Sequence, residues 1–432
     1  MSLFGSLTTA IGGLAAQSRA LGHVSDNVAN SQTVGYKRVD TNFVNYLTQS
    51  SATGHEPGTV IARPAFTNTV QGTVEQSDSP LSLAIGGQGF FSVAAARGTV
   101  NGQPTFDDRQ FFTRAGDFRM DKDGYLVNGS GYYLQGWPSD SAGNPDRTTL
   151  SPIRVNQQVF NPVATSQVQL AANLPNTAAG PITTQAQVYD TLGTRHVVNL
   201  TFTKAALNEW DLSLSVPDDV NGAARGTVRL QFGPAATPVA ADGTIGSFTA
   251  ATGSITIPTA AAGDPAEFTF TADFGQGAQT ISLNLGNFGQ ARGLTQFNEK
   301  EFAVRNLAQD GVPLGSYAGL SLRDNGDVAV NYDNGQSRVI ARVPLVAFSD
   351  PDKLQRLDGQ AFMRTIESGE ARVTDAASNG VGKLITGSVE RSNVDIATEF
   401  TKLIVAQRAY TANTRIVTTS DEMLQETLNM RR

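Results

Sequence analysis

The chain has 432 residues, enough for two or three domains, and only 16% of them are charged, which is low for a globular protein. Its net charge of −7 argues against a nucleic-acid surface, which needs a basic stripe, and the absence of cysteine excludes disulfides and thiolate metal sites. No apolar run reaches about 18 residues, so no membrane-spanning segment is expected.

The first thirty residues predict an amphipathic helix. Its seam positions alternate in steps of four and three, as in a coiled coil, at Leu7, Ile11, Leu14, Ser18, Leu21, Ser25 and Val28. Gly12, Gly13 and Gly22 each weaken a helix by about 1 kcal/mol relative to alanine, so this helix is expected to form mainly when packed. The segment lacks the basic start of a Sec signal peptide, which predicts either a cytoplasmic protein or export without a cleaved signal.

The middle of the chain predicts β-structure. Residues 78–137 and 319–348 contain short apolar and aromatic runs separated by glycine-rich, Asp-Gly or Asn-Gly turns, which favour hairpins. These two stretches share one style and are interpreted as halves of a single β domain.

Between these halves lies a region of different character. Its apolar residues alternate cleanly with polar ones, as at Val198, Leu200 and Phe202, which predicts an antiparallel sheet with one face in water. Residues 230–291 contain no lysine or arginine. The sequence therefore predicts a β domain inserted into the first one, over residues 146–290.

The end of the chain predicts a second helix over residues 392–430, about 57 Å long at 1.5 Å per residue. Ser392 followed by Asp395 indicates a capping-box start. The four-three spacing continues through Ile396, Phe400, Leu403, Gln407, Tyr410, Thr414, Val417, Asp421, Leu424 and Leu428. The two terminal helices are expected to pair, within one subunit and also between subunits, with the polar seam positions restricting the register.

No set of residues predicts catalysis. His23, His55 and His196 lack metal-ligand spacing, and DKDG at residues 121–124 is better explained as a turn, because Tyr132 stands where a Ca²⁺ loop needs glutamate. A pair of carboxylates for sugar hydrolysis stays open, since such residues need not be close in sequence. The sequence therefore predicts no catalytic, cofactor-binding or metal site.

Several segments resemble a known family. DNVANSQTVGYKR (residues 26–38) and residues 392–430 resemble the N- and C-terminal signatures of the rod and hook family of bacterial flagellar axial proteins. LSLAIGGQGFF (residues 81–91) and FTRAGDFRMDKDGYLVNGSGYYLQGW (residues 112–137) resemble hairpin motifs of that family. The inserted region, with QLAANLP and VYDTLGT, is similar to the hook subunits and absent from the shorter distal rod subunits.

This resemblance implies a mixed α and β, multidomain fold. Long terminal helices pair as a coiled coil, and nested all-β domains of antiparallel sheet or barrel lie outside them. The implied divisions are a terminal helical domain at 1–30 and 392–432, a linker at 31–70 and 360–391, a first β domain at 71–145 and 291–359, and the inserted β domain at 146–290.

The resemblance also implies a structural, non-enzymatic role without cofactors. Subunits of this kind assemble into a hollow, curved helical tube that acts as a universal joint, carrying motor torque from the rod to the filament of the flagellum. The implied partners are further copies of the chain, the distal rod protein, the hook cap protein, the hook-filament junction proteins and the flagellar export apparatus, with no nucleic acid and no membrane span. The implied location is extracellular, at the hook and basal body.

Two other functions stay open. The first is a distal rod subunit of the basal body, which the length of the chain disfavours. The second is a secreted β-rich adhesin or carbohydrate-active protein, which leaves the paired terminal signatures unexplained.

The expected subunit-packing residues follow from the two seams and the matched motifs. Tyr36 and Lys37 are the expected contacts of the linker, and Arg408 and Arg415, seven residues apart, are expected to pair with a carboxylate of a neighbouring subunit. The whole set is Leu7, Ile11, Leu14, Leu21, Val28, Tyr36, Lys37, Ile396, Phe400, Leu403, Gln407, Arg408, Tyr410, Thr414, Arg415, Val417, Leu424 and Leu428.

Overall fold

A computed structural model describes residues 3–50, 55–100, 102–157, 159–259, 261–299 and 301–430. The chain divides into two compact units. Unit 1 contains Met1–Gln157, Gly319–Asn331 and Ser337–Arg432, and unit 2 contains Gln158–Ala318 and Tyr332–Gln336. The fold is mostly β with two α-helices in the described ranges, as predicted, and both helices belong to unit 1.

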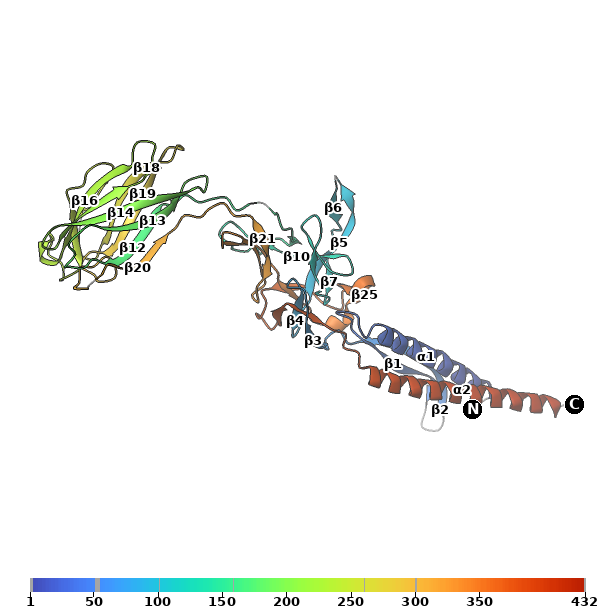
Figure 1. Ribbon diagram of the computed structural model, residues 1–432. Coiled ribbons are helices and arrows are strands. Elements are labelled where there is room, and N and C mark those ends of the chain that lie inside the picture. The colour runs from blue at the N-terminus through green and yellow to red at the C-terminus, as the bar shows by residue number, and fades with distance from the viewer. Residues whose placement is uncertain are drawn as a thin grey trace. The chain divides into compact units, whose positions relative to one another are not determined.

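The two helices are α1 (Leu3–Ala29) and α2 (Ile396–Asn429), and they lie side by side (Figure 1). They run antiparallel, because Gly13 faces Asn413 whereas Asn27 hydrogen-bonds Glu399 at the other end of α1. Helix α2 begins four residues later than the sequence predicts. Its N-cap is Asp395, whose carboxylate accepts a hydrogen bond of 2.7 Å from the Thr398 amide.

Residues 31–70, expected to be a linker, instead form an antiparallel hairpin that packs on α1. Its strands are β1 (Val39–Ser50) and β2 (His55–Phe66). Pro57 and Gly58 in β2 are typical of a linker, but a two-stranded ribbon leaves one edge of each strand unpaired, and proline is tolerated there.

The rest of unit 1 is built on one twelve-stranded sheet. Its main path runs β21 (Tyr317–Leu322), β22 (Asp327–Tyr332), β23 (Ser337–Arg342), β10 (Tyr132–Pro138), β5 (Phe91–Val100), β7 (Phe111–Thr113), β26 (Ala361–Met363) and β25 (Gln355–Leu357). Four short strands pair beside this path: β6 (Gln103–Phe106), β8 (Arg119–Met120), β9 (Leu126–Val127) and β11 (Ser151–Pro152). The two predicted halves of the first β domain therefore share one sheet.

Three strand pairs complete unit 1: β24 (Leu345–Ala347) with β27 (Arg372–Thr374), β4 (Leu83–Gly86) with β28 (Lys383–Thr386), and β3 (Val74–Gln76) with β29 (Ser388–Glu390). Residues 360–391 thus contribute strands to the β-structure, although the sequence predicts a linker there. The reason is that each of these short strands pairs with a strand far away in sequence, a partnership that local pattern does not reveal.

Unit 2 is a sandwich of two sheets (Figure 1). One sheet contains β18 (Pro265–Asp273), β19 (Ala278–Asn287), β12 (Gln167–Asn173) and β20 (Ala303–Gln309); the other contains β13 (Ile182–Tyr189), β14 (Arg195–Ala206), β15 (Glu209–Ser215), β16 (Ala224–Phe232) and β17 (Ile245–Thr249). Side chains from both sheets form one buried core that includes Leu200, Phe202, Trp210 and Phe268. The predicted alternation is confirmed in β14 between Val198 and Phe202 and in β15, where every second residue is buried.

The second unit differs from the expected insertion in its bounds and in its strand pairing. It begins at Gln158 instead of residue 146, and it includes Tyr332–Gln336. It runs to Ala318, beyond the expected end at residue 290, because β20 pairs with β12 near the start of the unit. Its strands are antiparallel except for the pair β12 and β19, which is parallel. No helix in the described part of the chain is long and apolar enough to cross a membrane.

Candidate assembly interface

The surface of α1 that is buried inside the chain is made of small residues. Ala10, Ala16, Ala20 and Val24 are 2–6% exposed, and they recur at helical spacing. A methyl group added at Gly12 would lie 1.8 Å from Thr59 Oγ1 on β2, and one at Gly13 would lie 2.9 Å from the Asn413 side chain on α2. These two glycines therefore let α1 approach both of its neighbours closely.

The predicted seam of α1 lies beside this buried face. Ile11 is 51% exposed, and the other apolar members, Leu7, Leu14, Leu21 and Val28, are half-buried. The expectation that the larger residues bury against the partner helix within one chain is wrong for Ile11. Close packing selects the small residues instead.

In helix α2, too, the predicted seam lies beside the residues that are buried. Glu399, Ala406 and Ser420 are its buried residues, and the predicted Leu403, Val417 and Leu424 are half-buried beside them. The remaining predicted residues of this helix are all exposed: Ile396, Phe400, Gln407, Arg408, Tyr410, Thr414, Arg415 and Leu428. The structure thus brings few of the predicted positions together within one chain, and it leaves most of them available to another.

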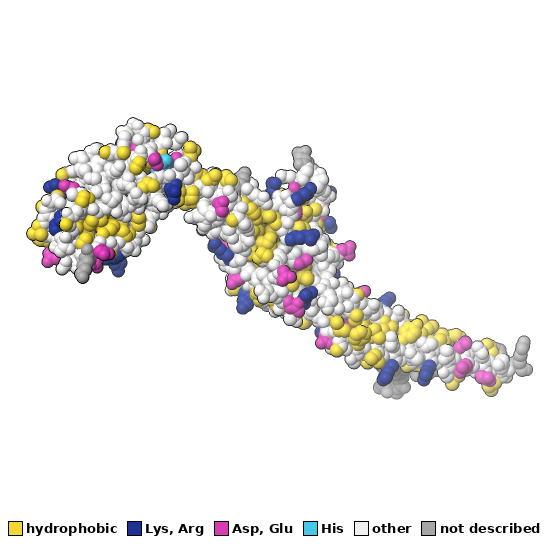
Figure 2. Space-filling view, in the orientation of Figure 1, with side chains coloured by type: hydrophobic (Ala, Val, Ile, Leu, Met, Phe, Trp, Pro, Cys, Tyr) yellow, Lys and Arg dark blue, Asp and Glu magenta, His cyan; other side chains and the backbone are white. Residues whose placement is uncertain are grey.

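The helix pair exposes a row of large apolar side chains. Ile396, Phe400 and Ile404 follow one another at four-residue intervals, so they form one row on α2, and they are 42%, 51% and 51% exposed. Figure 2 shows hydrophobic side chains gathered over the two helices. Monomeric soluble proteins seldom leave such a continuous apolar surface in water.

A groove of about 620 Å³ adds to this surface. It lies between α1, β1 and α2, and its apolar lining includes Ala20, Val24, Val39, Phe43 and Val405. The hairpin therefore forms one wall of an open, partly apolar channel beside the helices.

A polar network fixes the helices to the hairpin. The Asn27 amide is 1% exposed; it donates to the Val39 carbonyl (2.9 Å) and to Glu399 (3.0 Å), and its oxygen accepts from the Val39 amide (2.9 Å). The Lys402 ammonium joins Glu399 (2.7 Å) to Asp40 (2.5 Å). Burial alone would lower the pKa of Lys402, but its hydrogen bonds to Asp40 and Glu399 outweigh burial and raise that pKa.

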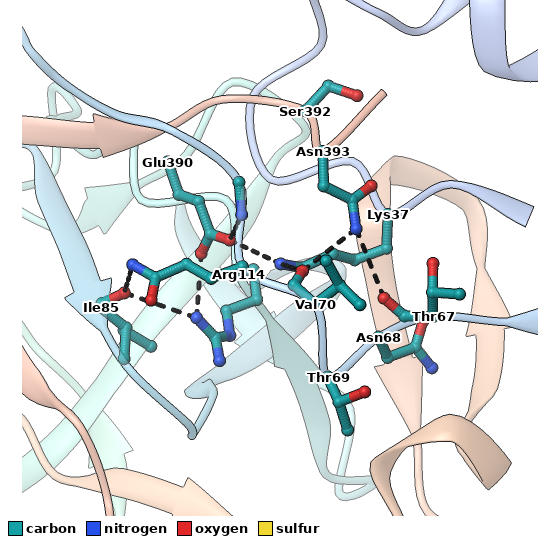
Figure 3. Close-up of polar contacts among 12 residues, drawn as sticks. Lys37, Thr67, Asn68, Thr69, Val70, Ile85, Arg114, Glu390, Ser392 and Asn393 are labelled. Carbon is teal, nitrogen blue, oxygen red and sulfur yellow. Dashed lines mark hydrogen bonds and ion pairs between the residues drawn. The ribbon is translucent and has the colours of Figure 1, made fainter. Parts of the chain in front are cut away.

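A second, fully buried cluster lies where the helices meet the β-structure, and it is formed by Lys37, Arg114 and Glu390 (Figure 3). One oxygen of Glu390 is 2.5 Å from Lys37 Nζ, and the other is 2.9 Å from Arg114 Nη1. The first oxygen also accepts from the Gly72 amide (2.8 Å), while Lys37 donates to the Val70 carbonyl (2.7 Å). One carboxylate thus connects four distant segments of the chain.

The electrostatics of this cluster follow from burial. Burial lowers the pKa of the Lys37 ammonium to about 8; the carboxylate of Glu390 opposes that shift, and the guanidinium of Arg114 adds to it. The buried cluster contains two cations, Lys37 and Arg114, and one anion, Glu390. Such a site is sensitive to the loss of its single carboxylate.

Lys37 is therefore not available to a neighbouring subunit, contrary to the expectation from its motif: its side chain is 1% exposed and paired inside the chain. Tyr36 is half-buried, and its hydroxyl donates to Asn27 (3.2 Å). The nearby Gly35 has φ of 72°, and a methyl group there would lie 2.5 Å from the Ala115 amide nitrogen. Tyr36 and Lys37 thus make their contacts inside unit 1.

Sequence reasoning missed Asn27, Glu390 and Arg114. Asn27 and Lys37 stand in the motif that carried the resemblance, so the motif was the available signal, whereas the Lys37–Glu390 pair joins residues 353 positions apart. The structure brings no group of three or more His, Cys, Asp or Glu into a metal-binding arrangement within its described residues.

Four family models match the chain, and all of them describe flagellar proteins. They are "Flagella basal body rod protein" at residues 7–37, "Flagellar hook protein FlgE/F/G D1 domain" at 84–178, "Flagellar basal body protein FlaE D2 domain" at 154–312 and "Flagellar basal body rod FlgEFG protein C-terminal" at 385–430. Together with the helix pair formed by the two chain ends, these matches define an axial protein of the flagellum.

Curated relatives match over the whole length of the chain, and two of them illustrate the similarity. The flagellar hook protein FlgE of Brucella abortus is 31% identical and that of Rhizobium meliloti 30%, each with 100% of both chains covered. The solved structure of Helicobacter pylori flagellar hook protein FlgE2 is 15% identical, with a TM-score of 0.48, over 72% of this chain and 98% of that one. The chain belongs to the flagellar hook protein family, which confirms the family and the hook-subunit role predicted from its motifs.

Proposed function

We propose that this chain builds the flagellar hook by self-assembly through its terminal helices. The observation that carries the proposal is the exposed apolar row of α2, formed by Ile396, Phe400 and Ile404. Burying this row against other copies removes it from water and so favours assembly. No catalytic step and no cofactor enter this function.

The assembly is a hollow, curved helical tube that works as a universal joint between the rod and the filament. Helices α1 and α2 line its inner wall, pairing as a coiled coil that extends between subunits, and the β-structure faces outward. The predicted packing residues on these helices meet neighbouring copies. The low charge of the chain, 16%, suits shallow contacts that slide as the hook bends.

The proposed partners follow from this position. The distal rod protein lies below the hook, and the hook-filament junction proteins lie above it. The flagellar export apparatus delivers the subunits, and the hook cap protein assists their addition at the tip. Helix α1 fits this route, because a helix that contains Gly12, Gly13 and Gly22 is weak until neighbours pack on it.

Electron microscopy of the purified full chain under polymerising salt tests the proposal. We expect tubes from the unaltered chain and none from Phe400→Ser combined with Ile404→Ser, which removes two exposed apolar anchors. Thr411→Ser, an exposed polar position of the same helix, serves as the control and should still form tubes. Because all three side chains point into solvent, circular dichroism should be unchanged. Normal tubes from the double variant would contradict the proposal.

A further inference from the structure

Helix α2 carries a stripe of charged residues that is sorted by sign. Arg408, Arg415 and Glu422 are spaced seven residues apart, and Glu426 follows one turn later. All four side chains are exposed. In Figure 2, Lys and Arg side chains lie along the helix pair, and Asp and Glu side chains gather near its end.

The stripe lies on the face of α2 that points away from α1. Ala406 and Ser420 are buried, and Asn413 between them faces Gly13 of α1. Arg415 follows Asn413 by two residues, which is about 200° around an α-helix. Positions seven residues before and after Arg415 share its direction, so the whole stripe points outward.

These charges have no ion-pair partner among the described residues, in contrast to Lys402 of the same helix. Lys402 binds Asp40 and Glu399. In the β-structure of unit 1, Arg114 binds Glu390 and Arg342 binds Asp327. A stripe with both signs and no partner in its own chain is complementary to a second copy of itself when the two are shifted along the helix axis.

Only some shifts bring opposite charges together. With no shift between parallel helices, each charged residue lies beside the same residue of the second copy, so like charges face each other. A shift of seven residues pairs Arg415 with Glu422 but sets Arg408 against Arg415. A shift of fourteen residues, about 21 Å at 1.5 Å per residue, sets Arg408 against Glu422 and places Glu426 beside Ala412, between the two arginines.

We propose that α2 of one copy packs beside α2 of a second copy in parallel orientation, shifted by fourteen residues, so that Arg408 pairs with Glu422 and Glu426 lies between Arg408 and Arg415. The partner is another copy of this chain, and the inference rests on the proposed self-assembly. Parallel packing follows because a head-to-tail contact continues as a helical polymer, whereas an antiparallel contact closes as a two-fold dimer. The apolar Ile404, one turn before Arg408 and 51% exposed, extends the same contact.

Charge reversal with rescue tests the pairing. We expect Arg408→Glu and Glu422→Arg each to raise the critical concentration for tube formation about tenfold, because each replaces an attraction with a repulsion. The combined variant should return to within about threefold of the unaltered chain. Asp108→Arg is the control: it reverses the charge at an exposed residue outside α2 and should leave assembly unchanged.

Cross-linking tests the shift itself. The chain has no cysteine, so two introduced thiols report contacts between copies without background. Thr411 and Gln425 are exposed and fourteen residues apart, and Thr418 is exposed and seven residues from either. A short thiol-reactive cross-linker should join copies of Thr411→Cys with Gln425→Cys into a ladder, and should leave Thr411→Cys with Thr418→Cys largely unlinked.

The outcomes separate the two proposals. Tubes from the unaltered chain, combined with failure of the charge-swapped variant to recover or with a ladder from the seven-residue pair alone, would overturn the fourteen-residue shift and leave self-assembly intact. The absence of tubes from the unaltered chain would contradict both self-assembly and the fourteen-residue shift, which depends on it.

Discussion

The carboxylate of Glu390 makes contacts that join both ends of the chain to the β-structure of unit 1. It lies in β29, just ahead of α2, and it binds Lys37, which follows α1, and Arg114, which follows β7. Its side chain is completely buried, so water cannot replace either contact. Removing a partner from such a cluster leaves buried cations without compensation, which costs far more than breaking an exposed pair.

Glu390→Gln should therefore lower the free energy of unfolding of unit 1 by about 3–5 kcal/mol. The neighbouring Glu75–Arg391 pair provides a control, because its side chains are 50% and 40% exposed. Glu75→Gln should change stability by about 0–1 kcal/mol. Urea unfolding of the monomer measures both values, and an equal effect of the two substitutions would contradict the role given to the buried cluster.

Lys37 predicts a dependence of stability on pH. Its pKa is about 8 in the folded chain, below the ordinary 10.5. Between these values the unfolded chain holds a proton that the folded chain has released, so the stability contributed by Lys37 rises with pH in this window and is constant below it. The stability of the unaltered chain relative to Lys37→Met should thus increase above about pH 8. Lys353→Met, at a side chain that is 54% exposed, makes the same substitution at the surface and serves as the control.

At the scale of elements, the glycines of α1 divide into two kinds. Gly12 faces Thr59 at a distance that excludes a methyl group, whereas a methyl group at Gly22 would meet no atom within 4 Å. The sequence alone treats the two glycines alike, as weak points of a helix. The structure shows that only the first is required for packing.

Gly22→Ala should therefore stabilise α1 by about 0.5–1 kcal/mol through helix propensity. Gly12→Ala should destabilise unit 1 instead, because the new methyl group overlaps Thr59 Oγ1, 1.8 Å away. Adding Thr59→Ala should recover part of that loss. Thermal unfolding of the three variants provides the measurement, and a gain of stability in Gly12→Ala would show that the close approach is not needed.

The comparison of sequence with structure is also clearest at this scale. Hydrophobic periodicity predicted both helices and the sandwich strands, because burial of one face depends on local order, as in Leu200 and Phe202 of β14. It missed the strands β1 and β2, because Pro57 and Gly58 are typical of a linker. It also assigned the helix seam to the largest side chains, whereas the close contact with α2 selects Ala10 and its small neighbours.

Hydrophobic periodicity did not predict the contacts at the candidate assembly interface. The motif residues pointed to the correct region, but the partner of Lys37 lies 353 residues away, and no local spacing indicates Glu390. Conversely, Phe400 was expected in a contact between subunits, and its 51% exposure leaves it free for that role, which stays a prediction.

At the scale of the whole molecule, the nesting of the chain places the buried charge cluster and the exposed helix row in the same unit. Unit 1 contains both chain ends, and unit 2 has a core of its own, drawn from two sheets. The buried Lys37–Glu390 pair and the exposed helix row both belong to unit 1. Substitutions at these sites should therefore leave the core of unit 2 intact.

The two tryptophans of the chain make this separation measurable, since Trp137 is buried in unit 1 and Trp210 in unit 2. Trp210→Phe leaves fluorescence from unit 1 alone, and it removes an indole nitrogen that has no hydrogen-bond partner among the described residues. In that background Glu390→Gln should lower the urea midpoint by about 1–3 M, given typical denaturant slopes. In the complementary Trp137→Phe background, the same substitution should leave the Trp210 transition in place. A common shift of both signals would mean that the two units unfold as one, because cooperative unfolding couples every probe to the weakest site.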